Sequence, residues 1–409
     1  MKKKKLTQIT ESSTKIFLYA NDNGLPPSKA MNVFYNKRME LNRDISNLAI
    51  NAYVNLHKPD DLLIIDSMAA SGIGSIRMLK ECQKIANIVI NDINPEAVKL
   101  IKKNLKLNRI NKTSNQIKIT NKDANALFSE ITDKGLILSS GKKKKPNVIS
   151  IDPFGTPNLY IDSAFKTIQK SNALVCITAT DTAVLFGVRS KACMRKYLSK
   201  PLRNEYSKEI GARILVQFIA RIAAINKVGI IPLLTFYSGH FIRVFCLTFK
   251  NKQRISKFLK KNGYIIHCKN CGYRSSHGDN ILHLPLECPM CGNKKSLDYA
   301  GPLWADKIHD INFINEILLL NEKSKFLNKN RISKILTFAR QEIDMPISYY
   351  NIHKLSQNLK LSSIPKISNL INILKEKGYK SSRTHFDFLA IKTDMDLETL
   401  KNTLIDTKK

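Results

Sequence analysis

Seven short apolar runs alternate with amphipathic stretches between about Leu62 and Phe249. The runs are LLIID, IVIND, IKITNKD, NVISID, ALVCITATD, GIIPLLTFYS and FIRVFCLTFK. Apolar runs of this length, separated by segments with helical periodicity, are typical of a mostly parallel sheet flanked by helices. The sequence therefore predicts an α/β domain over this part of the chain.

The first four of these runs each end in an acidic residue, at Asp66, Asp92, Asp123 and Asp152. A single acid after a strand is ordinary turn chemistry and indicates little. In an open α/β sheet, however, the carboxyl ends of the strands face the ligand crevice. Four acids in series can therefore converge on one bound molecule, and we expect a ligand site at this edge of the sheet.

A glycine-containing loop follows the first strand. The segment DSMAASGIGSIRML (Asp66–Leu79) opens a helix and has Gly72 and Gly74 in its turn. Such a loop lets backbone N–H groups and a helix N-terminus approach a dinucleotide, a phosphate or S-adenosylmethionine. Asp92 stands where Rossmann-like folds place the acid that holds the ribose hydroxyls of an adenosine. Because the full G-x-G-x-x-G of NAD sites is missing, S-adenosylmethionine is the favoured cofactor.

The third strand ends in NKDANAL, which offers two contacts to an adenine ring. The Asp123 carboxylate could accept from the adenine amino group, and the N–H of Ala124 could meet a ring nitrogen. Asp123 is equally suited to cap the helix that begins near Ala124. Both roles can coexist on one carboxylate.

The fourth strand delivers the tetrapeptide DPFG to the same edge. The exocyclic amine of a base is a poor nucleophile because its lone pair is delocalised into the ring. Hydrogen bonds from this amine to the Asp152 carboxylate and the Pro153 carbonyl would orient it for attack. Phe154 could stack on a flipped base, and Gly155 permits the tight turn. A plain Asp-Pro turn with a packed Phe is the alternative, but the position at a strand end favours catalysis.

The charge of the chain points to a polyanionic partner. Lys and Arg number 67 against 33 Asp and Glu, a formal net charge of +34. An excess of this size is typical of nucleic-acid-binding proteins. The sequence has no uncharged apolar run of about 18 residues and no apolar signal-peptide core at its start. We therefore expect a cytoplasmic protein without a membrane segment.

Four of the eight cysteines form a tight group with the spacing C-x₂-C-x₁₆-C-x₂-C. They are Cys268, Cys271, Cys288 and Cys291. This spacing is typical of a structural zinc ribbon, in which four thiolates fill a tetrahedral shell. Gly272 and Gly292 follow the two pairs and fit tight metal knuckles. Two disulfides are the alternative, which a reducing compartment disfavours.

The last part of the chain has the outline of a winged helix. After about Phe326, the segment KISNLINILKEKGYKSSRTHFDFLAIKT indicates a helix, a turn and a β-hairpin. Further upstream, TFYSGHFIRVF looks like the closing hairpin of the sheet. There His240 and Arg243 could contact RNA, or could serve pairing at the edge of the sheet.

Several stretches together resemble the tRNA guanine-N2 dimethyltransferases, which use S-adenosylmethionine to modify guanine at tRNA position 26. They are VFYNKRMELNRDIS, DSMAASGIGSIR, NDINPEAV, NKDANALF, IDPFGTPNLYIDSA, ITATDTAVL and GPLWADKIHD, in the family's order over most of the chain. The resemblance implies an enzyme that mono- and dimethylates the exocyclic N2 of that guanine. It implies tRNA as the partner and no stable protein partner.

The resemblance also implies the organisation of the chain. Residues 1–262 would form a Rossmann-like class I methyltransferase domain with a mostly parallel seven-stranded sheet. Residues 263–409 would form an α+β region, zinc-binding and winged-helix-like, that holds tRNA. Two other functions stay open at this point: another exocyclic-amine methyltransferase acting on RNA or DNA, and a catalytically inactive nucleic-acid-binding protein.

The resemblance further implies which residues meet the cofactor. They are Arg43, Arg77, Asp92, Asp123 and Ala124, and we expect the strand-end acid Asp66 to meet the cofactor as well. The planar fork of Arg43 suits the methionine carboxylate, although a structural ion pair with Asp44 or Glu40 is the alternative. The family usually has an arginine two residues after the loop glycine, where this chain has Gly74. The missing contact is either lost or taken over by Arg77.

Overall fold

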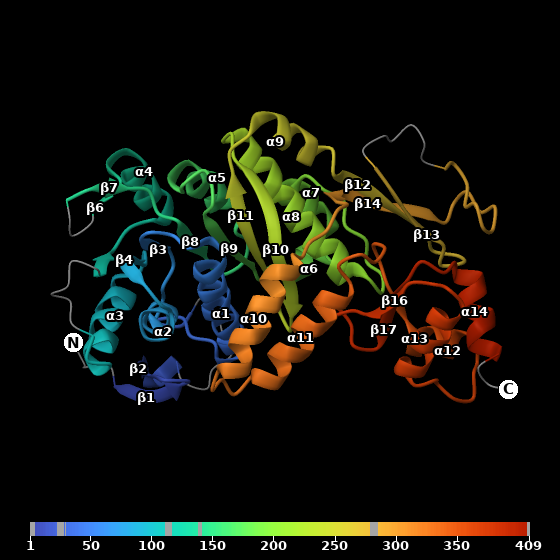
Figure 1. Cartoon of the computed structure of the whole chain (residues 1–409), viewed down its shortest axis with the longest axis horizontal. Coiled ribbons are helices and arrows are strands. Elements are labelled where there is room, and N and C mark those ends of the chain that lie inside the picture. The colour runs from blue at the N-terminus through green and yellow to red at the C-terminus, as the bar shows by residue number, and fades with distance from the viewer. Residues whose placement is uncertain are drawn as a thin grey trace.

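The computed structural model describes residues 5–22, 28, 30–110, 117–137, 141–278 and 285–406. The described chain begins with a hairpin of β1 (Leu6–Glu11) and β2 (Thr14–Tyr19), followed by 3₁₀ turns at Ala20–Asp22 and Lys37–Met39. The long helix α1 (Glu40–His57) then leads into the central sheet. The hairpin lies beside α3 (Pro95–Leu107), outside that sheet (Figure 1).

The central sheet has seven strands in the order β10-β11-β9-β8-β3-β4-β5. All neighbouring pairs are parallel except the two that involve β11, which runs antiparallel to β10 and to β9. This confirms the predicted mostly parallel, seven-stranded sheet. The strands are β3 (Leu62–Asp66), β4 (Ile85–Asn91), β5 (Ile117–Thr120), β8 (Val148–Ile151), β9 (Leu174–Ala179), β10 (Gly229–Ser238) and β11 (Phe241–Phe249).

Helices cover both faces of the sheet. Successive strand residues point to opposite faces, so each strand contributes apolar side chains to both. On β3, Ile65 belongs to a core shared with α4 (Ala124–Lys134), α5 (Asn158–Thr167) and α8 (Ser207–Ile225). The preceding residue, Ile64, belongs to a second core shared with α1, α2 (Ile73–Glu81) and α3. The remaining elements here are β6 (Leu136–Ile137), β7 (Lys143–Lys144), α6 (Thr182–Leu185), α7 (Ser190–Tyr197) and α9 (Lys252–Leu259).

The cysteine quartet is attached to a three-stranded sheet of order β13-β12-β14. Its strands are β12 (Asn262–Cys268), β13 (Arg274–His277) and β14 (Leu297–Trp304). The chain then returns to the first part of the molecule through α10 (Ile311–Lys323), which packs against α1, and α11 (Lys329–Gln341), which packs against α10 (Figure 1). Their apolar residues share a core with α1 and the sheet. The division at residue 263 therefore stays a prediction.

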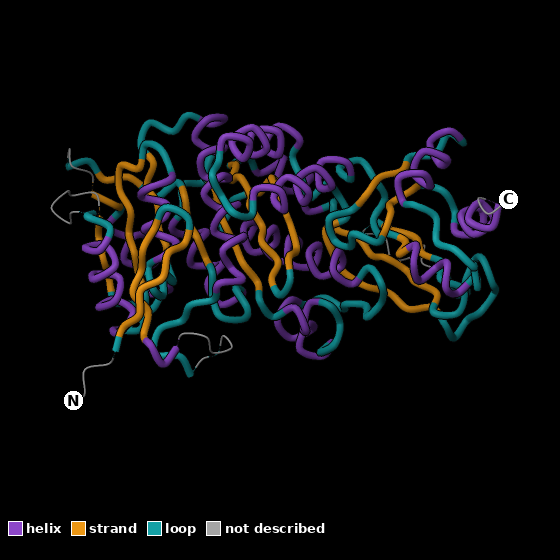
Figure 2. The backbone as a smooth tube through the Cα atoms, turned by 90° about the horizontal axis from the view of Figure 1, so that it is seen from below, coloured by secondary structure: helices purple, strands orange, loops and turns teal. Residues whose placement is uncertain are grey.

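The C-terminal segment has the strand and helix order expected of a winged helix. After α11 come β15 (Tyr350–Asn351), α12 (Ile352–Asn358), α13 (Ile367–Glu376), β16 (Ser381–Arg383), β17 (Ala390–Thr393) and α14 (Leu397–Asp406). The three strands form a sheet of order β15-β17-β16, in which β16 and β17 make the predicted hairpin. Figure 2 shows this part at the end of the long axis that carries the C-terminus, away from the large sheet.

A buried ionic group joins this segment to α8. Lys392 Nζ donates to Glu209 Oε1 at 2.6 Å and lies 3.7 Å from Glu342 Oε2. All three side chains are 2 % exposed or less. Because each buried charge has an opposite partner, the contact fixes the segment against the first part of the molecule. Among the described helices, none is both long and apolar enough to cross a membrane.

Candidate active site

A cavity of about 990 Å³ opens at the carboxyl ends of the parallel strands. Its volume lies at the upper end of the range for small-molecule sites, about 300–1,000 Å³. The structure brings all four acids at the strand ends to this cavity: its lining includes Asp66, Asp92, Asp123 and Asp152. Their convergence follows from the common direction of β3, β4, β5 and β8.

The glycine loop carries the N-terminus of α2 to the cavity wall. Gly72 precedes α2 with a φ of +79°, and a Cβ there would lie 3.0 Å from Ile101 Cγ1. Both the backbone angle and the packing therefore favour glycine at this position. Gly74 also lines the cavity. A Cβ on Gly74 would meet Asp66 Oδ2 at 3.7 Å, so the loop approaches this acid closely.

The two acids nearest this loop are held in fixed orientations. Asp92 accepts from the N–H of Ala70 at 2.7 Å and from that of Asn94 at 2.8 Å. Asp66 accepts a hydrogen bond from Ser75 Oγ. Burial, opposed by the hydrogen bond from Ser75 and assisted by the nearby charges of Asp152 and Asp92, raises the pKa of Asp66 to about 6. The cavity floor is therefore a desolvated, acidic surface.

Asp123 caps helix α4, which confirms one of its two expected roles. Its Oδ1 accepts from the N–H groups of Asn125 and Ala126, at 2.8 and 3.3 Å. The side chain is exposed and lines the cavity, as does the buried Ala124. Because a carboxylate has about four acceptor positions, the cap is compatible with an adenine contact, which stays a prediction.

Arg43 lines the cavity but is already engaged by a carboxylate from the N-terminal hairpin. Its Nε and Nη2 donate to the two oxygens of Glu11, each at 2.6 Å, and Nη2 also donates to the Asn36 carbonyl at 3.2 Å. The ion-pair partner is thus Glu11 rather than Asp44 or Glu40. Sequence reasoning missed Glu11 because it lies 32 residues earlier, in a hairpin with no local link to α1.

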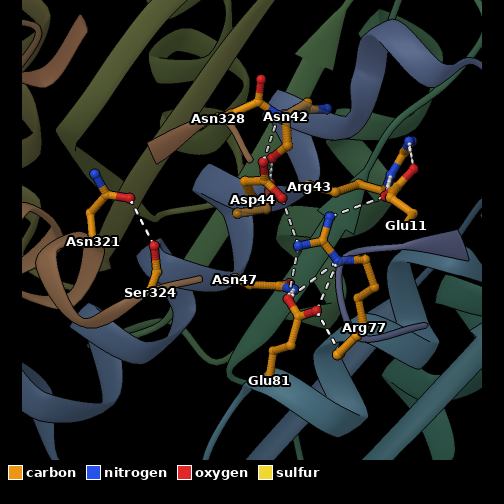
Figure 3. A network of polar contacts seen from close by, with 12 residues as sticks. Glu11, Asn42, Arg43, Asp44, Asn47, Arg77, Glu81, Asn321, Ser324 and Asn328 are labelled. Carbon is orange, nitrogen blue, oxygen red and sulfur yellow. Dashed lines mark hydrogen bonds and ion pairs between the residues drawn. The ribbon is translucent and has the colours of Figure 1, made fainter. Parts of the chain in front are cut away.

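The expectation that Arg77 lines the cofactor site is not met. Arg77 is absent from the cavity lining, and its side chain is 0 % exposed. Figure 3 shows its guanidinium among three carboxylates: Glu11 at 3.0 Å, Asp44 at 2.6 Å and Glu81 at 2.9 Å. Asn328, just before α11, donates to Asp44 at 2.8 Å. Arg77 therefore joins the hairpin, α1 and α2 from behind the cavity, and it does not replace the arginine missing at Gly74.

Replacing Arg77 by Met is expected to destabilise the protein strongly. The variant would remove the buried cation that Glu11, Asp44 and Glu81 share, and breaking a buried pair from one side costs about 3–5 kcal/mol. The matched control is Lys99→Met, which removes an exposed partner of Glu96, at 68 % side-chain exposure, and should cost less than about 1 kcal/mol. Calorimetric melting of both variants measures the difference. Equal melting temperatures would contradict a structural role for Arg77.

The DPFG turn is held rigidly against the next strand. The N–H of Gly155 donates to Thr180 Oγ1 at 2.7 Å, and the N–H of Thr180 donates to the Gly155 carbonyl at 2.9 Å. Gly155 has a φ of +109°, which favours glycine. Asp152, which lines the cavity with Pro153, accepts from Asn42 Nδ2 at 3.4 Å. The acid and the carbonyl predicted to grip an amine are thus both at the cavity.

Two aromatic rings stand at this end of the cavity. Phe154 is 53 % exposed and meets Phe34 edge to face, with 5.5 Å between ring centroids. Both rings line the cavity. An exposed apolar ring beside the half-buried Asp152 is suited to stacking on a planar base. Sequence reasoning missed Phe34, although it lies within the family-like stretch VFYNKRMELNRDIS.

The structure supports neither of the two roles left open for Arg243, an RNA contact and pairing at the edge of the sheet. Arg243 is 2 % exposed and donates to the hydroxyls of Thr178, Ser46 and Ser150, at 2.7, 3.1 and 3.3 Å. It lies in β11, an interior strand of the sheet, and forms part of the cavity floor. His240 stands at the cavity, 3.0 Å from Asn36 Nδ2. Its contact with RNA stays a prediction.

The cysteine quartet has the geometry of a tetrahedral metal site. Cys268 and Cys291 place their sulfurs 3.7 Å apart, and Cys271 and Cys288 place theirs 3.6 Å apart. All four sulfurs lie within 4.8 Å of one another. A Zn–S bond of about 2.3 Å requires sulfurs about 3.8 Å apart in a tetrahedron, so the residues fit zinc.

The two turns of the quartet are of the same kind. The N–H of Gly272 donates to the Cys268 carbonyl at 2.9 Å, and the N–H of Gly292 donates to the Cys288 carbonyl at 2.8 Å. Both glycines have positive φ, +85° and +65°. The predicted knuckles are therefore present, and a closed shell of four thiolates leaves no position for catalysis.

Comparison with known proteins relates the whole chain to one family. The model of the family described as N2,N2-dimethylguanosine tRNA methyltransferase matches residues 10–405. A tRNA (guanine(26)-N(2))-dimethyltransferase of Methanosphaera stadtmanae is 37 % identical over 377 residues, covering 92 % of each chain. One from Methanosarcina mazei is 34 % identical over 405 residues, covering 97 % of this chain and 98 % of its own.

A solved structure is similar over the same extent. Trm1 from Pyrococcus horikoshii, in complex with S-adenosyl-L-methionine, superposes with a TM-score of 0.80 at 30 % identity. The match covers 98 % of this chain and 100 % of that one. The likeness therefore includes the C-terminal region as well as the large sheet.

Proposed function

Because the chain belongs to the N2,N2-dimethylguanosine tRNA methyltransferase family, we infer that it methylates the exocyclic N2 of guanine at position 26 of tRNA, once and then again. S-adenosylmethionine supplies the electrophilic methyl group. The main support for this inference is the DPFG turn, whose Asp152 and Pro153 line the cavity beside the exposed ring of Phe154.

We propose that the strand-end acids and the glycine loop hold the cofactor. Asp92, oriented by two backbone N–H groups, would accept from the ribose hydroxyls. Asp123 and Ala124 would meet the adenine edge. Glu11 occupies the Nε and Nη2 side of Arg43, so the methionine carboxylate would be held through the remaining nitrogen, Nη1. Asp66 would lie beneath the glycine loop and hold the conformation of that loop by accepting the hydrogen bond from Ser75.

Asp152 and Pro153 would act on the target amine. A base extruded from the tRNA would stack on Phe154, with its N2 amine donating to the Asp152 carboxylate and the Pro153 carbonyl. Two acceptors favour the pyramidal, nucleophilic form of the nitrogen and fix its direction of attack. Asp152 would then take the departing proton, directly or through water.

The zinc quartet and the winged-helix-like segment would hold the body of the tRNA. The net charge of +34 suits a long phosphate backbone, and binding that rests on phosphate contacts weakens steeply as salt rises. We propose that the protein acts in the cytoplasm, where four free thiolates can remain available to zinc.

Product mapping on unmodified tRNA tests the proposed function. Incubation with labelled S-adenosylmethionine is expected to yield N2-methylguanosine and N2,N2-dimethylguanosine in the nucleoside digest. A matched transcript with adenine at position 26 should take up at least about tenfold less label, because it lacks the N2 amine. Methylated adenosine as the main product, or equal labelling of the two transcripts, would contradict the proposal.

A further inference from the structure

A second acid enters the cavity beside the DPFG turn. Asp181 follows β9, and β9 is the neighbour of β8 in the sheet. The residue before it, Thr180, is joined to Gly155 by two hydrogen bonds of 2.7 and 2.9 Å. Asp181 therefore has a fixed position relative to Asp152, and both line the same cavity.

Asp181 forms a pair with a lysine on the cavity wall. Lys196 Nζ, from α7, donates to Asp181 Oδ2 at 3.1 Å, and Tyr197 Oη donates to Oδ1 at 2.9 Å. Tyr197 is 0 % exposed and is absent from the lining, so it supports the carboxylate from behind. The Tyr197 hydroxyl also lies 3.0 Å from Thr156 Oγ1. The cavity wall thus presents a preoriented acceptor next to a donor.

This pair is complementary to the two groups of guanine that Asp152 and Pro153 would not contact, N1–H and O6. Along its Watson–Crick edge, guanine has the N2 amine, then the N1–H donor, then the O6 acceptor. A carboxylate complements N1–H and an ammonium complements O6. Adenine has an acceptor at N1 and a donor at C6, so it would set acceptor against acceptor and donor against donor.

We propose that Asp181 accepts from N1–H, and Lys196 donates to O6, of the target guanine whose N2 amine is held by Asp152. The inference rests on the proposed function and adds a means of selecting guanine among bases. Lys196 has three N–H donors, so it can keep its contact with Asp181 while one of them reaches O6. Asp181 and Lys196 then determine which base is accepted, whereas Asp152 and Pro153 bind the N2 amine that reacts.

Base analogues at position 26 of the tRNA separate this role from a structural one. 2-Aminopurine keeps the N2 amine but lacks both N1–H and O6. A hydrogen bond involving a charged group contributes roughly 10- to 100-fold. Asp181→Asn and Lys196→Met are therefore each expected to lower at least tenfold the ratio of kcat/KM for guanine to that for 2-aminopurine. Lys166→Met, which removes an exposed lysine from Asp162 on α5, should leave this ratio within about twofold.

Inhibition by unreactive tRNA provides a second measurement. Hypoxanthine at position 26 keeps N1–H and O6 but has no amine to methylate, whereas unsubstituted purine has none of these groups. The hypoxanthine transcript should inhibit the wild-type enzyme at least tenfold better than the purine transcript. Either variant should abolish most of this difference.

The outcomes distinguish this inference from the proposed function. If the ratio and the inhibition difference remain as in the wild type, or if both variants merely lose activity on guanine and 2-aminopurine equally, the base-reading role is overturned. If the wild-type enzyme forms no N2-methylguanosine at all, the proposed function itself fails. Affinity for S-adenosylmethionine, measured by calorimetry on each variant, shows that the cavity is intact.

Discussion

Asp152→Ala is expected to lower turnover on unmodified tRNA by at least about a hundredfold while S-adenosylmethionine still binds. The variant removes the carboxylate that orients the amine and takes its proton, and loss of one principal transition-state group costs about 10²–10³ in kcat. Asp152 stands on a turn fixed by Gly155 and Thr180, so the truncation should leave the cavity in place. Single-turnover rates with labelled cofactor, together with calorimetric titration, measure the two effects separately.

An acid outside the cavity provides the control. Asp133 is exposed on α4 and absent from the cavity lining, so Asp133→Ala should keep turnover within about twofold. Near-normal turnover of Asp152→Ala would refute the assignment of this residue. Loss of cofactor binding in the same variant would indicate that Asp152 holds the cofactor rather than the target guanine.

Cys268→Ser is expected to reduce bound zinc from about one ion per chain to almost none. Cys268 is 0 % exposed and lies 3.7 Å from Cys291, so the shell loses a ligand that neither solvent nor a neighbour replaces. Structural zinc sites contribute about 10–16 kcal/mol in isolated zinc-finger peptides. The β13-β12-β14 sheet should loosen, and the melting temperature should fall. Elemental analysis of the purified protein measures the metal.

A cysteine outside the quartet is the matched control. Cys82 lies at the end of α2, with its sulfur 3.7 Å from the Asn47 carbonyl. Cys82→Ser keeps a donor at this position and should retain about one zinc ion. Cofactor affinity should change little in either variant, because neither Cys268 nor Cys82 lines the cavity. Full zinc content in Cys268→Ser would contradict the metal site.

The features that sequence could predict depend on local spacing or on strand direction. The convergence of Asp66, Asp92, Asp123 and Asp152 follows once the strands are taken as parallel, because their carboxyl ends then share one edge. The metal site follows from two CxxC pairs, since a knuckle is built from neighbours in the chain. Both predictions needed only the order of the residues along the chain.

The features that sequence could not predict depend on contacts between distant segments. Glu11 meets Arg77 across 66 positions, and nothing in the hairpin indicates that an acid there will be buried. Its presence explains why Arg77 is turned away from the cavity, whereas the resemblance placed it in the lining. The sequence left two roles open for Arg243, and the structure supports neither, because β11 lies between β10 and β9 and is therefore an interior strand.

The most direct test of the account is the position of the target guanine in a complex with tRNA and S-adenosylhomocysteine. The distance to measure runs from the guanine N2 to the Asp152 carboxylate and to the Pro153 carbonyl. We expect about 3 Å to each oxygen, with the ring lying against Phe154. A guanine still stacked within the tRNA, or extruded with its N2 facing away from Asp152, would contradict it.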